Sequence, residues 1–348
     1  LVLRFCLGLH FKPDEVVGHH DLKKIVAELT LLFVRVQNAI AERRHLFHPR
    51  SAISLMESDR STCAAGSDME IFDGVCTVEA YDDHPEVHIG YRILHKRAAE
   101  VSSSTDQHPL LIYFHGNGEV CEDYTQWAAV YEKFPSSFLV FDYRGYGWST
   151  GKPCMECLTK DPIICMYKLG ALLESHKLPW PWPAPVVLMG RSLGVQVVGS
   201  LIGQFPEMFD GLICESGGAN TAEEHYQGML DACGASRNQA TAAFEAMRSF
   251  LAEDLPLGCP PVPQIIAPHG TCEGIRGYRG PVLILHGAMD SIVPLDHGRR
   301  NYESANNASR RDFVEIQADH NSMAGVVEFW QKQVMFVRKL VKRPLQAV

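Results

Sequence analysis

The sequence predicts an α/β fold with a mostly parallel central sheet flanked by helices, a helical cap insertion and a helical N-terminal extension. Two observations lead to this prediction. Short, nearly continuous apolar runs of strand length alternate along the chain with longer segments of helical spacing. One of these runs, 186–189, leads into Gly190-Arg191-Ser192-Leu193-Gly194, a Gly-x-Ser-x-Gly pentapeptide at an expected strand-to-helix junction. Functional side chains in such sheets are expected just past the carboxyl ends of the strands.

The sheet is expected to open with a hairpin. Apolar and polar residues alternate over 75–81 and 87–94, on either side of the turn sequence Asp82-Asp83-His84-Pro85. Apolar runs predict further strands at 110–114, 138–141, 186–189, 212–214, 282–285 and 313–316. Helices are expected near 121–133, 158–174, 193–204, 297–306 and 323–341.

The chain is expected to divide into an N-terminal extension with a linker, residues 1–70, and an α/β domain, residues 71–348. Apolar residues at three-to-four spacing over 14–47 predict one or two amphipathic helices, which either pack on the domain or contact a membrane or partner. The apolar run 1–9 is interrupted by Arg4 and is too short to span a bilayer, and it also fits the remnant of a removed targeting or membrane segment.

The longest interval between predicted strands covers about residues 216–280, far above the usual length of a connection. It contains a helix-like section and then a Pro-rich stretch. An insertion at the carboxyl edge of the sheet predicts a cap over the site that sets substrate choice, with a peripheral helical excursion as the alternative.

Composition and cysteine content narrow the class of protein. With 348 residues, of which 46% are hydrophobic, the chain can bury a substantial core. The net charge of -9, without a cluster of Lys and Arg, argues against nucleic-acid binding. The eleven cysteines contain a single Cys-x2-Cys, Cys154 to Cys157, which we interpret as a reduced pair in a loop rather than a metal or redox site. Cys259 and Cys272 are expected to pair only under oxidising conditions. A cytoplasmic location follows from this cysteine usage, with peripheral membrane contact through the N-terminal segment left open.

Ser192 is the predicted nucleophile. A serine at a sharp turn between a strand and a helix has a strained backbone, and side chains two residues away on either side would collide there. Gly190 and Gly194 remove those side chains. A serine hydroxyl is a poor nucleophile at neutral pH, so it needs an adjacent base, and the base needs an acid to fix its tautomer.

Asp290 and His320 are the predicted acid and base. In the Gly-x-Ser-x-Gly architecture the chain order is serine, acid and then histidine, and each of these two residues follows an apolar strand. Glu215 and Asp319 remain rival candidates for the acid. His286 is expected to support its loop rather than to react.

Two backbone amides are the predicted donors to the oxyanion. The N–H of Leu193 follows the nucleophile at a helix start, and the N–H of Asn117 lies in the glycine-containing loop after the strand 110–114. His115 is expected to brace this loop. A phosphate-binding interpretation of the same loop is weak, because both a Walker lysine and the full dinucleotide fingerprint are missing.

Five motifs together carry a resemblance to a known superfamily. They are Phe114-His115-Gly116-Asn117-Gly118, the segment Asp142-Tyr143-Arg144-Gly145-Tyr146-Gly147-Trp148-Ser149-Thr150-Gly151-Lys152-Pro153, the pentapeptide around Ser192, His286-Gly287-Ala288-Met289-Asp290, and His320-Asn321. In this order, over roughly residues 75–341, the chain resembles the α/β-hydrolase superfamily, specifically the α/β-hydrolase-domain serine hydrolases of the branch that includes protein depalmitoylases. The resemblance implies the α/β-hydrolase fold and a triad of Ser192, Asp290 and His320.

The sequence of residues 142–153 predicts a tight turn that carries several aromatic side chains. The glycine-containing loop that carries Asn117, after the strand 110–114, is here called the oxyanion loop. Tyr143, Tyr146 and Trp148 are expected to brace it, and Arg144 is expected to pair with an acid. These roles are structural rather than catalytic.

These observations predict a serine hydrolase that cleaves an acyl ester or thioester through an acyl-enzyme, with a small molecule or an acylated protein as substrate. The chemistry requires neither a metal nor a cofactor. The same groups are able to cleave an amide, so an aminopeptidase-like hydrolase is the nearest alternative. A second alternative is a non-catalytic, hydrolase-like binding protein whose cap closes the pocket.

Overall fold

The computed structural model describes residues 47–51, 69–82, 84–96, 108–125, 136–219 and 271–341, all of which belong to one structural unit. The predicted N-terminal helices, most of the predicted linker and the middle of the predicted cap lie outside the described residues. In the part of the chain that is described, no helix is long and apolar enough to cross a membrane.

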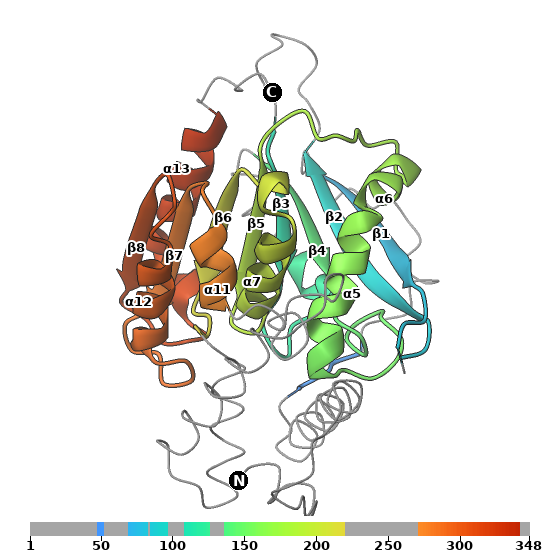
Figure 1. The fold of residues 1–348 in the computed structure, drawn as a ribbon, viewed down its shortest axis with the longest axis horizontal. Coiled ribbons are helices and arrows are strands. Elements are labelled where there is room, and N and C mark those ends of the chain that lie inside the picture. Colours follow the sequence, from blue (N-terminus) through green and yellow to red (C-terminus); the bar gives the residue numbers. More distant parts are fainter. Residues whose placement is uncertain are drawn as a thin grey trace, which may run out of the picture. The chain divides into compact units, whose positions relative to one another are not determined.

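The described strands form a single sheet, in the order β1-β2-β4-β3-β5-β6-β7-β8 (Figure 1). The strands are β1 (Met69–Val78), β2 (Val87–Lys96), β3 (Leu110–Phe114), β4 (Ser137–Phe141), β5 (Val186–Arg191), β6 (Gly211–Glu215), β7 (Val282–Gly287) and β8 (Arg311–Ile316). Strand β2 pairs antiparallel with β1 and with β4, and every other neighbouring pair is parallel. The predicted mostly parallel sheet is therefore confirmed.

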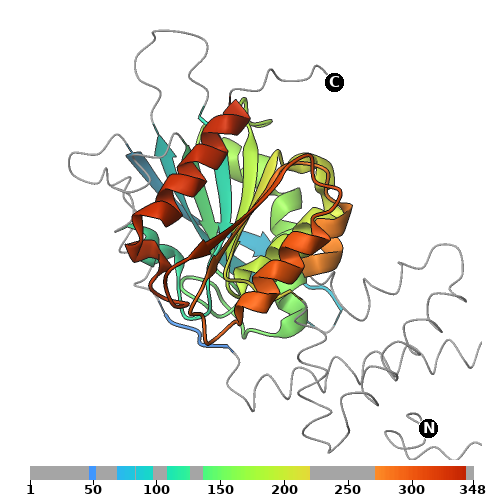
Figure 2. The ribbon, with the colours of Figure 1, turned by 90° about the vertical axis from the view of Figure 1, so that its left-hand side faces the viewer.

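Helices cover both faces of this sheet (Figure 2). One face carries α5 (Met155–Tyr167), α6 (Leu169–Ser175), α7 (Gly194–Gln204), α11 (Thr271–Gly277) and α12 (Leu295–Ser304). The other carries η1 (Cys121–Thr125) and α13 (Val327–Val341). The short turns η2 (Pro206–Met208) and η3 (Met323–Gly325) complete the described helical elements.

Strand β3 shows why the sheet needs two covered faces. All five of its residues are buried, and successive side chains point to opposite faces. Leu110, Ile112 and Phe114 belong to the apolar core under α5 and α7, whereas Leu111 and Tyr113 belong to the core under α13. A strand that is apolar throughout is stable only between two such layers.

Two predicted boundaries differ from the structure. Strand β1 begins at Met69, inside the segment predicted as linker, because it pairs with β2 over its whole length as far as Lys96. The predicted helix 158–174 is two helices, α5 and α6, which meet at Lys168.

The end of the predicted cap insertion is part of the helical layer. Helix α11 packs on α7, and the Thr271 hydroxyl donates a hydrogen bond of 3.3 Å to the carbonyl oxygen of Val195 in α7. Residues 271–277 therefore belong to the layer of helices that packs on the sheet and not to a cap over the site.

The cysteine pair that was expected to be reduced forms a disulfide between Cys154 and Cys157. Cys154 is the N-cap of α5, so the first helical turn brings the two Cα atoms to 5.2 Å, within the range of a disulfide. Cys272 is buried as a free thiol, and Cys259 lies outside the described residues. The disulfide removes one reason for expecting a reducing compartment.

Candidate active site

Ser192 lies on the sharp turn that joins β5 to α7. Its backbone φ of 51° is in the left-handed region that side chains rarely adopt, and its amide donates a hydrogen bond of 2.8 Å to the carbonyl oxygen of Glu215. A Cβ at Gly190 would lie 2.6 Å from the Gly194 oxygen, and a Cβ at Gly194 would lie 2.0 Å from the Phe114 oxygen. The two glycines of the pentapeptide therefore leave room for this turn, as the sequence predicted.

The structure brings together Ser192, His320 and Asp290 from three different strand ends. His320 Nε2 lies 2.9 Å from Ser192 Oγ, and His320 Nδ1 lies 2.7 Å from Asp290 Oδ2. The side chain of Asp290 is fully buried and that of His320 is 7% exposed. Both distances are those of hydrogen bonds, so the three groups form a continuous chain from carboxylate to hydroxyl.

The carboxylate of Asp290 is held by its own loop. Its Oδ1 accepts hydrogen bonds from the amides of Ile292, at 3.0 Å, and Val293, at 2.8 Å. Burial raises the pKa of Asp290, but hydrogen bonds from His320 and Val293 outweigh it and hold the pKa below the usual value. His286 braces the same loop, since its Nε2 lies 2.8 Å from the Val293 carbonyl oxygen. Asp290 is thereby kept ionised facing His320.

The rival acids have other contacts. Glu215 is buried, and its Oε1 accepts a hydrogen bond of 2.7 Å from the Gln333 amide group. The Asp319 side chain turns back on its own loop, where its Oδ1 accepts hydrogen bonds of 2.9 Å from the amides of Asn321 and Ser322. Asp290 is therefore the described carboxylate in hydrogen-bond contact with His320.

The loop after β3, which carries the predicted oxyanion donor Asn117, is held by several hydrogen bonds. The Gly116 amide is occupied, because it donates a hydrogen bond of 2.7 Å to Glu119 Oε2. The Asn117 side chain accepts hydrogen bonds from the Tyr146 hydroxyl, at 2.7 Å, and from the His48 amide, at 2.8 Å. At the start of α7, the Leu193 amide has no acceptor among the described residues. The side chains of Glu119 and Asn117 thus fix the loop after β3.

Two tyrosines of the loop 142–153 hold the oxyanion loop, and Arg144 pairs with an acid, as the sequence predicted. The Tyr143 hydroxyl donates a hydrogen bond of 2.5 Å to the His115 carbonyl oxygen, and Tyr146 reaches Asn117. Arg144 forms two hydrogen bonds of 2.8 Å with Asp161 of α5, and both side chains are buried. Trp148 differs from the prediction, because its ring lies against the Arg92 guanidinium.

Arg191 is a residue of the site that the sequence analysis missed. It pairs with Glu119 of the oxyanion loop, and its Nη2 donates hydrogen bonds to the His320 carbonyl oxygen, at 2.9 Å, and to Asn321 Oδ1, at 3.0 Å. One guanidinium therefore ties the nucleophile turn to the two loops beside it. A charged residue inside the pentapeptide was the available signal, but its partners lie far away in the sequence.

Among the described residues, one group of three side chains, His84, Cys154 and Cys157, has the ligand atoms of a metal site, but its two cysteines are joined in a disulfide and therefore do not offer the thiolates that a metal ion needs. None of these residues contacts Ser192 or His320. The hydroxyl, imidazole and carboxylate of the candidate site are sufficient for nucleophilic attack on a carbonyl carbon.

Known proteins resemble the chain in sequence and in fold. Protein ABHD12B of Homo sapiens is 30% identical over 212 residues, covering 59% of this chain and 52% of that protein. Lysophosphatidylserine lipase ABHD12 of Rattus norvegicus is 28% identical over 212 residues, covering 59% of this chain and 48% of that protein. The chain thus spans about half the length of these curated relatives. No family model matches the sequence.

Among solved structures, the esterase Pf2001 of Pyrococcus furiosus superposes with a TM-score of 0.53 at 14% identity, covering 84% of this chain and all of that one. This likeness concerns the fold: the sheet with its two layers of helices. Together with the curated relatives, it shows that the chain belongs to the α/β-hydrolase superfamily.

Proposed function

We propose that the protein is a serine hydrolase that cleaves carboxylic esters through an acyl-enzyme on Ser192. The observation that carries this proposal is the position of His320, with one ring nitrogen 2.9 Å from Ser192 Oγ and the other 2.7 Å from Asp290 Oδ2. Imidazole in this position removes a proton from the hydroxyl on one side while the carboxylate stabilises the resulting positive charge on the other.

In the first half of the reaction, Ser192 Oγ attacks the ester carbonyl carbon and His320 Nε2 takes the hydroxyl proton. His320 then gives this proton to the departing alcohol as the C–O bond breaks. In the second half, water attacks the acyl-enzyme, and His320 acts again as base and then as acid. Asp290 stays ionised throughout, which agrees with its lowered pKa.

The negative charge that develops on the carbonyl oxygen needs donors. We assign this role to the backbone amides of Leu193 and Asn117. Leu193 has no other acceptor among the described residues, and the neighbouring Gly116 amide is already occupied by Glu119. Arg191, Tyr143 and Tyr146 hold the loops that carry these amides.

The name of one curated relative, a lysophosphatidylserine lipase, supports the ester as the reacting group. A single-chain phospholipid ester is therefore the first substrate class to test. A thioester reacts by the same steps because its carbonyl carbon is attacked in the same way, so small thioesters and acylated proteins belong in the same panel.

Labelling with a fluorophosphonate tests the activated serine directly. We expect wild-type protein to be labelled and Ser192→Ala to remain unlabelled, with Ser200→Ala on α7 as a matched control that is labelled like the wild type. Matched esters, thioesters and amides of short and long acyl chain, with a lysophosphatidylserine among them, then rank the substrates. Faster turnover of the amides would favour the aminopeptidase-like alternative. An unlabelled but folded wild type would favour the binding protein.

A further inference from the structure

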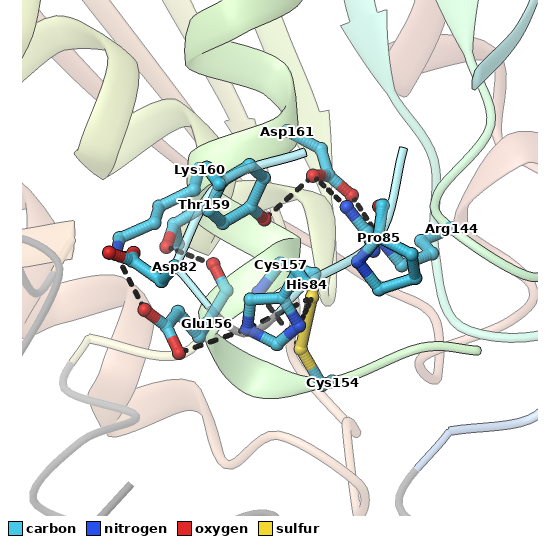
Figure 3. The surroundings of a disulfide bond; sticks show 11 residues. Asp82, His84, Pro85, Arg144, Cys154, Glu156, Cys157, Thr159, Lys160 and Asp161 are labelled. Atoms are coloured by element: carbon cyan, nitrogen blue, oxygen red, sulfur yellow. Dashed lines mark hydrogen bonds and ion pairs between the residues drawn. A yellow bond between two sulfur atoms is a disulfide. The ribbon is translucent and has the colours of Figure 1, made fainter. Parts of the chain in front are cut away.

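The disulfide between Cys154 and Cys157 has an uneven environment (Figure 3). Cys154 is partly exposed at the N-cap of α5, and its Sγ accepts a hydrogen bond of 3.1 Å from the Cys157 amide. Cys157 lies inside the first turn and is only 2% exposed. Cys154 is therefore the more exposed residue of the pair, and Cys157 is the protected one.

His84 faces the protected sulfur. It comes from the turn between β1 and β2, where it exchanges two backbone hydrogen bonds with Tyr81, of 3.1 and 2.8 Å. Its Nδ1 lies 3.5 Å from Cys157 Sγ, and its Nε2 lies 3.1 Å from Glu156 Oε2. The carboxylate orients the ring so that the other nitrogen meets the sulfur (Figure 3).

We propose that Cys154 and Cys157 form a thiol–disulfide exchange site that reacts with a small thiol such as glutathione, with Cys154 as the sulfur that is attacked. The N-terminus of α5 and the Cys157 amide stabilise a thiolate on Cys154, and His84 is placed to stabilise a thiolate on Cys157. This site uses none of the groups assigned to the hydrolase chemistry.

The exchange needs two small thiols and transfers two electrons. The thiolate of the first attacks Cys154 Sγ, forms a mixed disulfide there, and breaks the bond to Cys157, which leaves as a thiolate beside His84. The second small thiolate attacks the sulfur of the first in this mixed disulfide, which forms the small disulfide and releases the Cys154 thiolate. The pair is then reduced, with both thiolates free to take up protons, and the small thiol is oxidised.

Cys121 and Cys214 are buried free cysteines that have no comparable surroundings. Burial raises the pKa of Cys214 to about 12 and also raises the pKa of Cys121 well above its ordinary value. Their thiolates are disfavoured, and small thiols cannot reach them. Exchange is therefore expected at the N-terminus of α5 rather than at these positions.

A matched pair of variants tests the proposed asymmetry. Cys154→Ser and Cys157→Ser both lack the disulfide, so any loss of stability should affect both. With oxidised glutathione, Cys157→Ser should carry a glutathione on Cys154 at least about tenfold faster than Cys154→Ser acquires one on Cys157. Mass spectrometry of the peptide that contains residues 154–157 separates this reaction from those of the other cysteines. Near-ultraviolet circular dichroism reports the folding of both variants.

The wild-type protein provides the second measurement. In buffers of graded ratio of reduced to oxidised glutathione, its pair should change reversibly between the dithiol and disulfide forms, and His84→Gln should slow the reduction about tenfold. Equal glutathione uptake by the two serine variants would overturn the proposal. So would a wild-type pair that glutathione does not reduce, or a reduced pair that binds one Zn²⁺ and then resists oxidised glutathione.

Discussion

Among the described residues, His320 with Asp290 and His115 with Asp142 are both buried histidine–aspartate pairs at strand ends, but His320 reaches a nucleophile and His115 does not. His320 and Asp290 lie 2.7 Å apart, and the free side of the imidazole meets Ser192. His115 Nε2 lies 3.4 Å from Asp142 Oδ1, and both side chains are fully buried. His115 Nδ1 meets the carbonyl oxygen of its neighbour Gly116 instead of a reactive group.

The two pairs differ in the groups that their carboxylates contact. Asp142 accepts hydrogen bonds from the amides of Cys121, at 2.8 Å, and Trp148, at 3.1 Å, so it joins two loops. Asp290 Oδ1 accepts hydrogen bonds from the turn that follows it, whereas its Oδ2 faces His320 at 2.7 Å, with His286 Nε2 3.6 Å away. A histidine beside an aspartate is thus a common structural device, and access to a hydroxyl distinguishes the candidate catalytic pair.

The largest effect on activity is expected from His320→Ala, with His115→Ala as its matched control. His320→Ala should lower kcat/KM for an ester by about 10⁴-fold or more, because the proposed base is lost. His115→Ala should change it less than about tenfold, and should instead lower the free energy of unfolding by about 2–4 kcal/mol, because a buried ring is removed. Ester hydrolysis and urea unfolding measure the two quantities. A folded but equally inactive His115→Ala would erase the distinction between the pairs.

Substitution of the two aspartates should likewise lower activity in one case and stability in the other. Asp290→Asn should lower kcat about 10³–10⁴-fold, because an amide cannot stabilise the imidazolium as a carboxylate does. Asp142→Asn places an NH₂ group near the amide of Cys121 or Trp148, so two donors would face each other. We expect this variant to lose about 1–3 kcal/mol of stability and less than a tenfold factor in kcat. Loss of activity in Asp142→Asn at unchanged stability would contradict this expectation.

A smaller effect is expected from the residue that secures the His320 loop. Arg191→Lys keeps the charge but cannot reproduce the guanidinium bonds to His320 and Asn321, so kcat should fall about 3- to 30-fold. Arg299→Lys is a suitable control, because Arg299 forms an exposed ion pair of 3.0 Å with Glu315 and should leave kcat unchanged. Equal activity of the two variants in steady-state assays would show that the loop does not need Arg191.

The smallest effect on activity is expected at a carboxyl that contacts neither histidine. Burial raises the pKa of Glu215 from its ordinary 4.5 to about 8, against the lowering effects of Arg191 and Gln333. The folded protein therefore binds the extra proton in this window, and stability should fall as pH rises from about 4.5 to about 8. Glu215→Gln should flatten this dependence by about 1–3 kcal/mol in urea unfolding measured across that range. An unchanged pH profile would show that Glu215 is already ionised in the folded state.

Local patterns in the sequence predicted much of the sheet and of the candidate site. The run at 110–114 became β3 without a change of boundary, because five apolar residues in a row need two covered faces. The order of Ser192, Asp290 and His320 was predicted from the Gly-x-Ser-x-Gly architecture, and their position just past the strand ends was predicted from the parallel sheet, whose carboxyl ends meet at one edge. The start of β1 was not predicted, although Met69 and Ile71 are buried, because the segment before Val75 is short and mixed in character and its strand is set by pairing with β2 as far as Lys96.

Local sequence patterns could not predict contacts between residues that are far apart in the chain. Arg191 lies 72 residues from Glu119 and 129 from His320, so nothing in its immediate sequence specifies either bond. The cysteine prediction was wrong for a local reason. It depended on counting other pairs, whereas the N-cap geometry of α5 alone brings Cys154 and Cys157 together.

The contact between Gly194 and Phe114 has a consequence for engineering this protein. Because a Cβ at position 194 would lie 2.0 Å from the Phe114 oxygen, the turn that carries Ser192 and the strand that precedes Asn117 meet backbone to backbone. At this point the spacing of the two segments is set by backbone contact, with no side chain between them. Libraries that seek new substrate preference should therefore leave both glycines of the pentapeptide unchanged, together with Glu119, Tyr143 and Arg191, whose side chains hold the adjoining loops.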